Sequence, residues 1–286
     1  LVRMFLGIDQ CRVTAVCDVN RKSVEVAAKF VDATYGTKEC QKHADFRAML
    51  ADPAIDAVVI ATPHHWHGPM TVLACEHGKD VYVEKPTSNT IAEARAMVQA
   101  ARRYGRVVQV GTQARSSSRF AYAIDTIRRG RIGAIQQIMI GCDKPPVHCD
   151  LPAQPTPDDI DWDLWVGPAQ WRPYNEKLYA SSGLFIGFGG GEITDWGQHF
   201  FDVAQWALGM DHSGPVAVYP PDGKEREFLT FEYANAIKMI LHMKDGKRLS
   251  TGTKFIGTEG AIDTVAWDDT VAFEPRHLAH QYFDHT

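Results

Sequence analysis

The chain has 286 residues, which indicates two domains or one large one at about 100–200 residues per domain. Hydrophobic residues make up 45% of it and charged residues 23%, which excludes a mainly disordered chain. The net charge is −5 and there is no basic stripe, so nucleic acid is excluded as an expected partner. No run of about 18 apolar residues occurs, which excludes a membrane span.

The six cysteines form no C-x-x-C pair, which argues against zinc-ribbon and thioredoxin-like sites and favours free thiols in a reducing compartment. The first six residues lack the basic region, apolar stretch and cleavage site of a signal peptide. We therefore expect a cytoplasmic protein, with periplasmic or exported as the alternative if a leader region precedes Leu1.

The first 115 residues alternate between short apolar runs and helical patterns, which predicts a doubly wound parallel α/β sheet. In such a sheet the carboxyl ends of the strands share one edge, where ligands bind. The sequence predicts strands at 12–18, 56–61, 80–84 and 107–110, and helices at 21–31, 46–50, 69–77 and from the capping box at Thr90 to Gly105.

The second half has a different pattern, typical of an α+β domain with a large open, mainly antiparallel sheet. A loop rich in Pro, Asp and Trp covers 145–171, and a helix is predicted at 194–208. Strands are predicted at 229–233 and 236–243, joined by a tight turn, with a hairpin signal at Asp245-Gly246 and further strands over 256–266. We predict a Rossmann-like nucleotide-binding domain at 1–117 and a substrate and oligomerisation domain at 118–286.

A glycine-rich turn is missing from the predicted nucleotide-binding domain. No G-x-G-x-x-G occurs, and residues 187–191 (GFGGG) do not fit because Glu192 takes the place of the last glycine. The chain instead opens on a predicted helix at 1–8. We therefore expect the first domain to lack its first strand and the second to be incomplete at its C-terminus.

Asp18 ends the first predicted strand, where an acid can accept hydrogen bonds from the hydroxyls of an adenosine ribose. A carboxylate repels a 2′-phosphate, which favours NAD over NADP, whereas the nearby Arg21 could accommodate that phosphate. The alternative role for Asp18 is a turn that leads into the next helix.

Polar residues follow two further strands at the ligand edge. Thr62-Pro63 precede His64, His65 and His67, but no Cys or carboxylate lies within a few residues of them, so we expect no metal site. We expect these histidines to cap the helix or to approach a cofactor.

A lysine follows the strand at 80–84. Lys85 stands just before Pro86, which restricts the preceding residue to an extended conformation and so directs the lysine into the ligand crevice.

Asp195, His199 and Asp202 fall at i, i+4 and i+7 in the predicted helix at 194–208, so they share one face. A histidine beside a carboxylate can titrate near neutral pH and serve as a general base. An ion-paired structural histidine is the alternative.

Five segments together resemble the Gfo/Idh/MocA family of oxidoreductases: ATPHHWHG, VYVEKP, VGTQAR, DWDLWVGPAQWRPYN and GGGEITDWGQHFFDVAQWALGMD. The resemblance covers about residues 12–275, and it implies a Rossmann domain followed by an α/β domain. It also implies a nicotinamide cofactor, NAD with NADP as the alternative, and a sugar or polyol substrate.

The resemblance assigns roles residue by residue. Lys85 matches the family's E-K-P lysine, which touches both cofactor and substrate, and His199 matches its general acid/base. Asp195 would bind the sugar hydroxyl. By the same resemblance, further residues line the cofactor or the substrate: Thr62, Pro63, His67, Glu84, Gln113, Trp165 and Arg172.

The leading hypothesis is an NAD(P)-dependent oxidoreductase that transfers a hydride to or from a secondary alcohol of a sugar, polyol or glycoside. The alternatives are an NAD-dependent glycoside hydrolase and a non-catalytic sugar-binding relative. An open sheet is a liability in a monomer, so we expect a homodimer or homotetramer through it.

Overall fold

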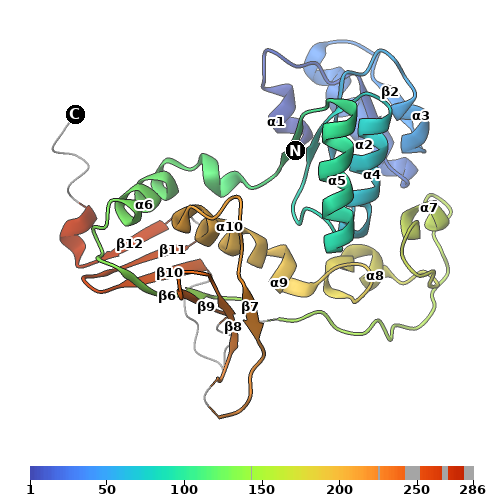
Figure 1. Ribbon diagram of the computed structural model, residues 1–286. Helices are drawn as coiled ribbons and strands as arrows, with labels where there is room; N and C mark the ends of the chain where they lie inside the picture. The colour runs from blue at the N-terminus through green and yellow to red at the C-terminus, as the bar shows by residue number, and fades with distance from the viewer. Residues whose placement is uncertain (143, 225, 242–251, 266–269, 280–286) are drawn as a thin grey trace. The chain divides into compact units, whose positions relative to one another are not determined.

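The computed structural model describes residues 1–142, 144–224, 226–241, 252–265 and 270–279 (Figure 1). It divides into two compact units, and each is described by itself. The first comprises 1–111 and 147–190, and the second 112–146 and 191–286. In these described residues, no helix is both long enough and apolar enough to cross a lipid bilayer.

The first unit holds five short parallel strands in two sheets. β1 pairs with β2, and β3, β4 and β5 form a second sheet in that order. The strands are β1 (Ala15–Cys17), β2 (Gln41–His43), β3 (Ala57–Ile60), β4 (Asp80–Val83) and β5 (Val108–Val110). The predicted strands are therefore present, but β1 is shorter than 12–18.

Helices alternate with these strands as predicted, and α4 and α5 pack side by side (Figure 1). Asn20 caps α2, and Gly36 ends it in the left-handed conformation that glycine adopts without strain. The helices are α1 (Val2–Leu6), α2 (Arg21–Tyr35), α3 (Phe46–Leu50), α4 (His64–Glu76) and α5 (Ile91–Tyr104).

The prediction that α4 begins at residue 69 was wrong. The helix begins at His64 with Pro63 as its N-cap, and Pro69 lies inside it. Proline is common in the first turn of a helix, which is why Pro69 looked like the start. The three histidines therefore lie in the first turns of α4.

Residues 147–190 belong to the first unit and carry a cluster of buried aromatic residues. The segment contains α7 (Trp162–Val166), α8 (Glu176–Ala180) and the 3₁₀ turn η2 (Ser182–Leu184). An isolated antiparallel bridge joins Ile160 to Asn20. The units thus divide the chain differently from the predicted continuous domains, since this segment was placed in the second one.

In its described residues, the second unit contains a seven-stranded sheet in the order β12-β11-β10-β6-β9-β8-β7. All neighbouring pairs are antiparallel except β6 with β9, which are parallel. The strands are β6 (Ile135–Ile140), β7 (Ala217–Tyr219), β8 (Leu229–Glu232), β9 (Lys238–Leu241), β10 (Gly252–Gly257), β11 (Ala261–Val265) and β12 (Thr270–Glu274).

Two helices cover one face of this sheet (Figure 1). α6 (Ser118–Arg128) packs on β11 and β12, and α10 (Gly197–Leu208) packs on β6 and β10. Alternate strand residues point toward these helices and are fully buried, as Ile138, Phe255 and Ile262 are. This layer is the core of the second unit.

The predicted tight turn between 229–233 and 236–243 is confirmed, because Tyr233 N–H donates to the Ile237 carbonyl and β8 and β9 form a hairpin. The end of the second of these strands, the Asp245-Gly246 hairpin and residue 266 lie outside the described residues.

Candidate active site

The carboxyl ends of β3 and β4 bring three of the predicted site residues to one edge. Thr62 follows β3, and Glu84 and Lys85 follow β4. Because these two strands are parallel neighbours, their ends lie side by side. The structure thus brings Thr62, Glu84 and Lys85 together.

His67 ties the loops that carry these residues. Its Nδ1 lies 2.6 Å from the carbonyl oxygen of Pro86, and its Nε2 lies 2.9 Å from that of Thr62. Burial lowers the pKa of His67, and the hydrogen bonds to the two carbonyls oppose that shift. The neutral ring donates to one of these two carbonyls and lies against the other, so His67 links the loops that follow β3 and β4.

The Thr62 hydroxyl is buried and has no hydrogen-bond partner among the described residues. Buried polar atoms in native proteins are almost always paired, so an orphaned hydroxyl at this edge fits a polar ligand. Nearby, Glu84 Oε2 accepts a hydrogen bond of 3.1 Å from the Lys85 amide. A Cβ at Gly111 would lie 3.0 Å from Glu84 Oε1, so a larger residue there would push this carboxylate aside by a few tenths of an ångström.

Asp18 takes part in a turn, as its alternative role required. Its Oδ1 accepts the Asn20 amide at 2.8 Å, just before α2. Burial raises the pKa of the Asp18 carboxyl, and this hydrogen bond opposes the rise. In the described part of the chain no second hydrogen bond reaches this carboxylate, which leaves Oδ2 for a ligand.

Arg21 is engaged by the segment at 158–161. Its guanidinium donates to the carbonyl of Asp158, and its amide donates to the carbonyl of Asp159 at 2.9 Å. The Asp159 carboxylate pairs with Lys22 at 3.1 Å. The guanidinium therefore points to the 158–161 segment and not to a free position near Asp18.

Trp165 lies in the aromatic core of residues 147–190. Its ring stacks on Trp162 at 4.4 Å, and its carbonyl accepts hydrogen bonds of 3.0 Å from Trp66 Nε1 and His65 Nε2. Arg172 donates to the Cys149 carbonyl at 2.7 Å. The contacts of both residues are structural, so their roles toward cofactor and substrate stay predictions.

The second unit carries the other predicted residues on η1 (Gln113–Ser116), α9 (Gly191–Asp195) and α10. The single helix predicted at 194–208 is in fact two helices, with Trp196 between them in helical backbone geometry. Asp195 ends α9, and His199 is 5% exposed in the first turn of α10. Its ring lies 6.0 Å from that of Trp196.

Asp202, which the helical spacing puts on the same face as His199, is paired with an arginine. Its Oδ2 lies 2.8 Å from Nε of Arg115, which comes from η1. Helical spacing placed Asp202 on the expected face, but spacing within one helix carries no information about Arg115. The only signal for Arg115 was its position in the VGTQAR segment, next to Gln113.

Lys85 belongs to the first unit, and Gln113, Asp195 and His199 to the second. Each set is defined within its own unit. The joint action of Lys85 with Asp195 and His199 is therefore a prediction.

Both parts of the chain match domains of one oxidoreductase family. Residues 3–112 match the NAD-binding Rossmann fold of the Gfo/Idh/MocA oxidoreductases, and residues 147–263 match their C-terminal α/β domain.

Three curated proteins illustrate the range of relatives. The chain is 28% identical over 163 residues to scyllo-inositol 2-dehydrogenase (NAD(+)) of Bacillus subtilis, covering 57% of this chain and 38% of that protein. It is 30% identical over 165 residues to levoglucosan dehydrogenase of Pseudarthrobacter phenanthrenivorans, covering 58% and 36%. A glycosyl hydrolase family 109 protein of Saccharopolyspora erythraea is 36% identical over 97 residues, covering 32% and 21%. The chain thus spans less than half the length of these relatives.

Solved structures share the fold at low identity. Myo-inositol 2-dehydrogenase of Lactobacillus plantarum superimposes with a TM-score of 0.63 at 18% identity, over 95% of this chain and 77% of that one. Aldose-aldose oxidoreductase of Caulobacter crescentus gives 0.62 at 20% identity, over 96% and 75%. With matches in both of its domains, the chain belongs to the Gfo/Idh/MocA family of oxidoreductases.

Proposed function

We propose that this protein is an NAD(P)-dependent oxidoreductase that acts on a secondary alcohol of a sugar or polyol. The observation that carries the proposal is the edge formed by Thr62, Glu84 and Lys85, where a buried hydroxyl lacks a partner and His67 fixes the loops. The names of the relatives support the substrate class, because inositol, levoglucosan and aldoses are all polyhydroxylated.

The residues that follow β1, β3 and β4 suit a dinucleotide. Asp18, after β1, would accept hydrogen bonds from the adenosine ribose hydroxyls through Oδ2, and Thr62 and Glu84 would lie nearer the nicotinamide. We favour NAD over NADP, because Asp18 would repel a 2′-phosphate and Arg21 is engaged by Asp158. The cofactor would supply hydride transfer, and the protein would supply geometry and charge.

The protein's side chains would handle the proton and the developing charge. His199 would take the proton of the substrate hydroxyl. The Lys85 ammonium would stabilise the alkoxide that forms. Asp195 would accept a hydrogen bond from a neighbouring hydroxyl and so orient the sugar. These roles require the two units to bring Lys85 and His199 to the same substrate.

Calorimetry and a substrate panel test the proposal. NAD and NADP are titrated into this chain and into a version lengthened at its N-terminus by a strand and a glycine-rich turn, and NADH formation is followed with inositols and aldoses. We expect NAD to bind more tightly than NADP, and K85M to lower turnover about 10²–10³-fold at an unchanged melting temperature. The matched variant K29M, on the exposed face of α2, keeps its activity. If neither version binds a dinucleotide, the proposal that the protein is an NAD(P)-dependent enzyme is refuted.

A glycoside hydrolase is the second candidate, favoured by the match to the family 109 protein. Such an enzyme would release sugar from a glycoside without net NADH. Sugar release with no accumulation of NADH would therefore favour the hydrolase over the dehydrogenase as the function of this protein. Sugar binding without dinucleotide binding would favour a non-catalytic protein.

A further inference from the structure

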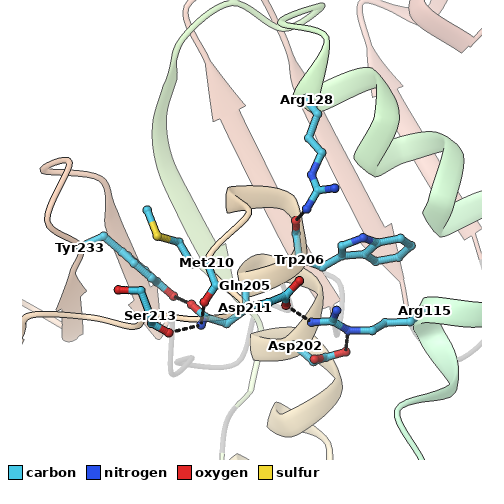
Figure 2. A network of polar contacts seen from close by, with 9 residues as sticks. All are labelled: Arg115, Arg128, Asp202, Gln205, Trp206, Met210, Asp211, Ser213 and Tyr233. Carbon is cyan, nitrogen blue, oxygen red and sulfur yellow. Dashed lines mark hydrogen bonds and ion pairs between the residues drawn. The ribbon is translucent and has the colours of Figure 1, made fainter.

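Arg115 is the centre of a polar network in the second unit (Figure 2). Its Nε donates to Asp202 Oδ2 at 2.8 Å, and its Nη2 donates to Asp211 Oδ1 at 2.7 Å. The guanidinium also lies over the Trp206 ring, 5.8 Å from the centroid. Hydrogen bonds to the two carboxylates raise the pKa of Arg115 further above its already high value, so Arg115 stays positively charged between them.

The loop that carries the second carboxylate, Asp211, is held by further hydrogen bonds. Gln205 Nε2 donates to the carbonyls of Met210 and Ser213, both at 3.0 Å, and the buried Tyr233 hydroxyl donates to Gln205 Oε1 at 2.5 Å (Figure 2). These bonds set the loop that carries Asp211. With Asp211 on one side, the guanidinium fork is directed toward Asp202 on the other.

Asp202 is a close neighbour of His199 on α10. The two residues are three apart, a spacing that puts Cβ atoms about 5–6 Å from each other on a helix surface. The Asp202 side chain is 19% exposed and His199 is 5% exposed, so water screens their interaction only in part. An unpaired Asp202 carboxylate would favour the protonated imidazolium of His199.

The elements that pack against α10 are η1, α9, α6, β6 and β10. Besides Arg115 on η1, they and the residue that follows α6 carry further ionisable groups that contribute to the electrostatic potential around α10. These groups are Glu192, Asp195, Arg119, Tyr122, Asp125, Arg128, Arg129 and Lys254.

We propose that Arg115 is a positioning residue of the candidate active site, which holds the Asp202 carboxylate away from His199 and so keeps His199 neutral and ready to accept a proton. Arg115 also joins η1, which carries Gln113, to α10. The inference rests on the proposed function only in taking His199 as the proton acceptor, and its test requires neither substrate nor cofactor.

The experiment follows the His199 imidazole by NMR in histidine-labelled protein, with H199Q to assign the signal. In R115M the unpaired Asp202 carboxylate should raise the titration midpoint of His199 by about half a pH unit. The double variant R115M/D202N should return to the midpoint of the unchanged chain. R115K keeps a charge but loses the two-pronged fork, so it should fall between the two.

A purely structural role for Arg115 predicts a different pattern, because D202N would then not reverse the shift. The matched control is R129M, which removes an arginine from an exposed ion pair with Asp125 on α6 and should leave the midpoint in place. An unmoved midpoint in R115M, or a shift that persists in the double variant, overturns the proposal. If R115M does not fold, R115K and D202N serve as the test variants. An upward shift of the His199 titration midpoint in D202N then overturns the proposal.

The two proposals fail separately. An NMR shift as described, in a protein that turns over no polyol, would remove the proposed function and leave the electrostatic role of Arg115 intact. Turnover of a polyol, together with an unchanged His199 midpoint in R115M, would keep the proposed function and remove the electrostatic role of Arg115.

Discussion

At the scale of single residues, the contact between Gly167 and Trp66 leaves no room for a side chain. Gly167 has a φ of +48°, and a Cβ there would lie 1.9 Å from Cζ2 of the Trp66 ring. G167A should therefore lower the free energy of unfolding by about 2–4 kcal/mol, through backbone strain and overpacking together. Urea unfolding measures this loss.

Gly36 gives a comparison for that substitution at the end of α2. It lies in the left-handed helical region, with φ +67° and ψ +29°, whereas Gly167 has a ψ of −116°, and a Cβ at Gly36 would meet nothing within 4 Å. G36A should cost about 1–2 kcal/mol, from backbone strain alone. Equal losses in the two variants would show that the Trp66 contact does not constrain position 167.

His67 predicts a dependence of stability on pH. Burial lowers its pKa in the folded protein below the ordinary value of 6.5. Its contribution to stability is therefore present above pH 6.5 and is lost as the pH falls below it, because the unfolded chain then binds the proton first. In H67Q the free energy of unfolding should fall less steeply between neutral pH and about pH 5.

Chemical denaturation at a series of pH values measures this slope. H77Q, a change at the exposed C-terminal end of α4, should keep the slope of the unchanged chain. An equally steep slope in H67Q would place the acid sensitivity elsewhere.

Single residues also show what the sequence could and could not predict of the site. The positions of Thr62, Glu84 and Lys85 followed from where strands end, which is a local property. The partner of Asp202 lies 87 residues away, and the ring of Trp165 contacts that of His65 in α4, with 5.4 Å between the ring centroids. Neither contact leaves a periodic trace in the sequence.

At the scale of elements, the N-terminus of α5 is set by a capping box. Thr90 Oγ1 accepts the Glu93 amide at 3.2 Å, and Glu93 Oε2 accepts the Thr90 amide at 3.2 Å. T90A should lower the free energy of unfolding by about 1 kcal/mol, because the Glu93 amide loses its acceptor at the helix end. T90S keeps the hydroxyl and should cost little, and a loss as large in T90S as in T90A would contradict the capping role.

This box was readable in the sequence because a cap and its partner lie three residues apart. The start of α4 was missed because Pro63 and Pro69 both suit the first turn of a helix, and local preference does not choose between them. The break at Trp196 was missed for a related reason. Its backbone stays helical, so the apolar periodicity continues across it.

At the scale of the whole molecule, sequence patterns gave the fold class but not the division into units. A change of pattern near residue 117 marks where the parallel strands end. The return of residues 147–190 to the first unit depends on long-range contacts, such as the bridge between Asn20 and Ile160. Such contacts are specified by three-dimensional packing and not by local periodicity.

The last prediction concerns the second face of the seven-stranded sheet. Among the described residues, α6 and α10 pack on one face, and the neighbouring pair Met139 and Ile240 is half-buried on the other, next to Lys254. Apolar residues on an open sheet face are a common site of association, so we expect light scattering to give the mass of a dimer or tetramer. A lysine at position 240 would have to be desolvated in such an interface, so I240K should shift the mass to that of a monomer.

V107K makes a comparable change at an exposed valine of the first unit and should leave the mass unchanged. A monomeric mass for the unchanged chain would refute association through this face.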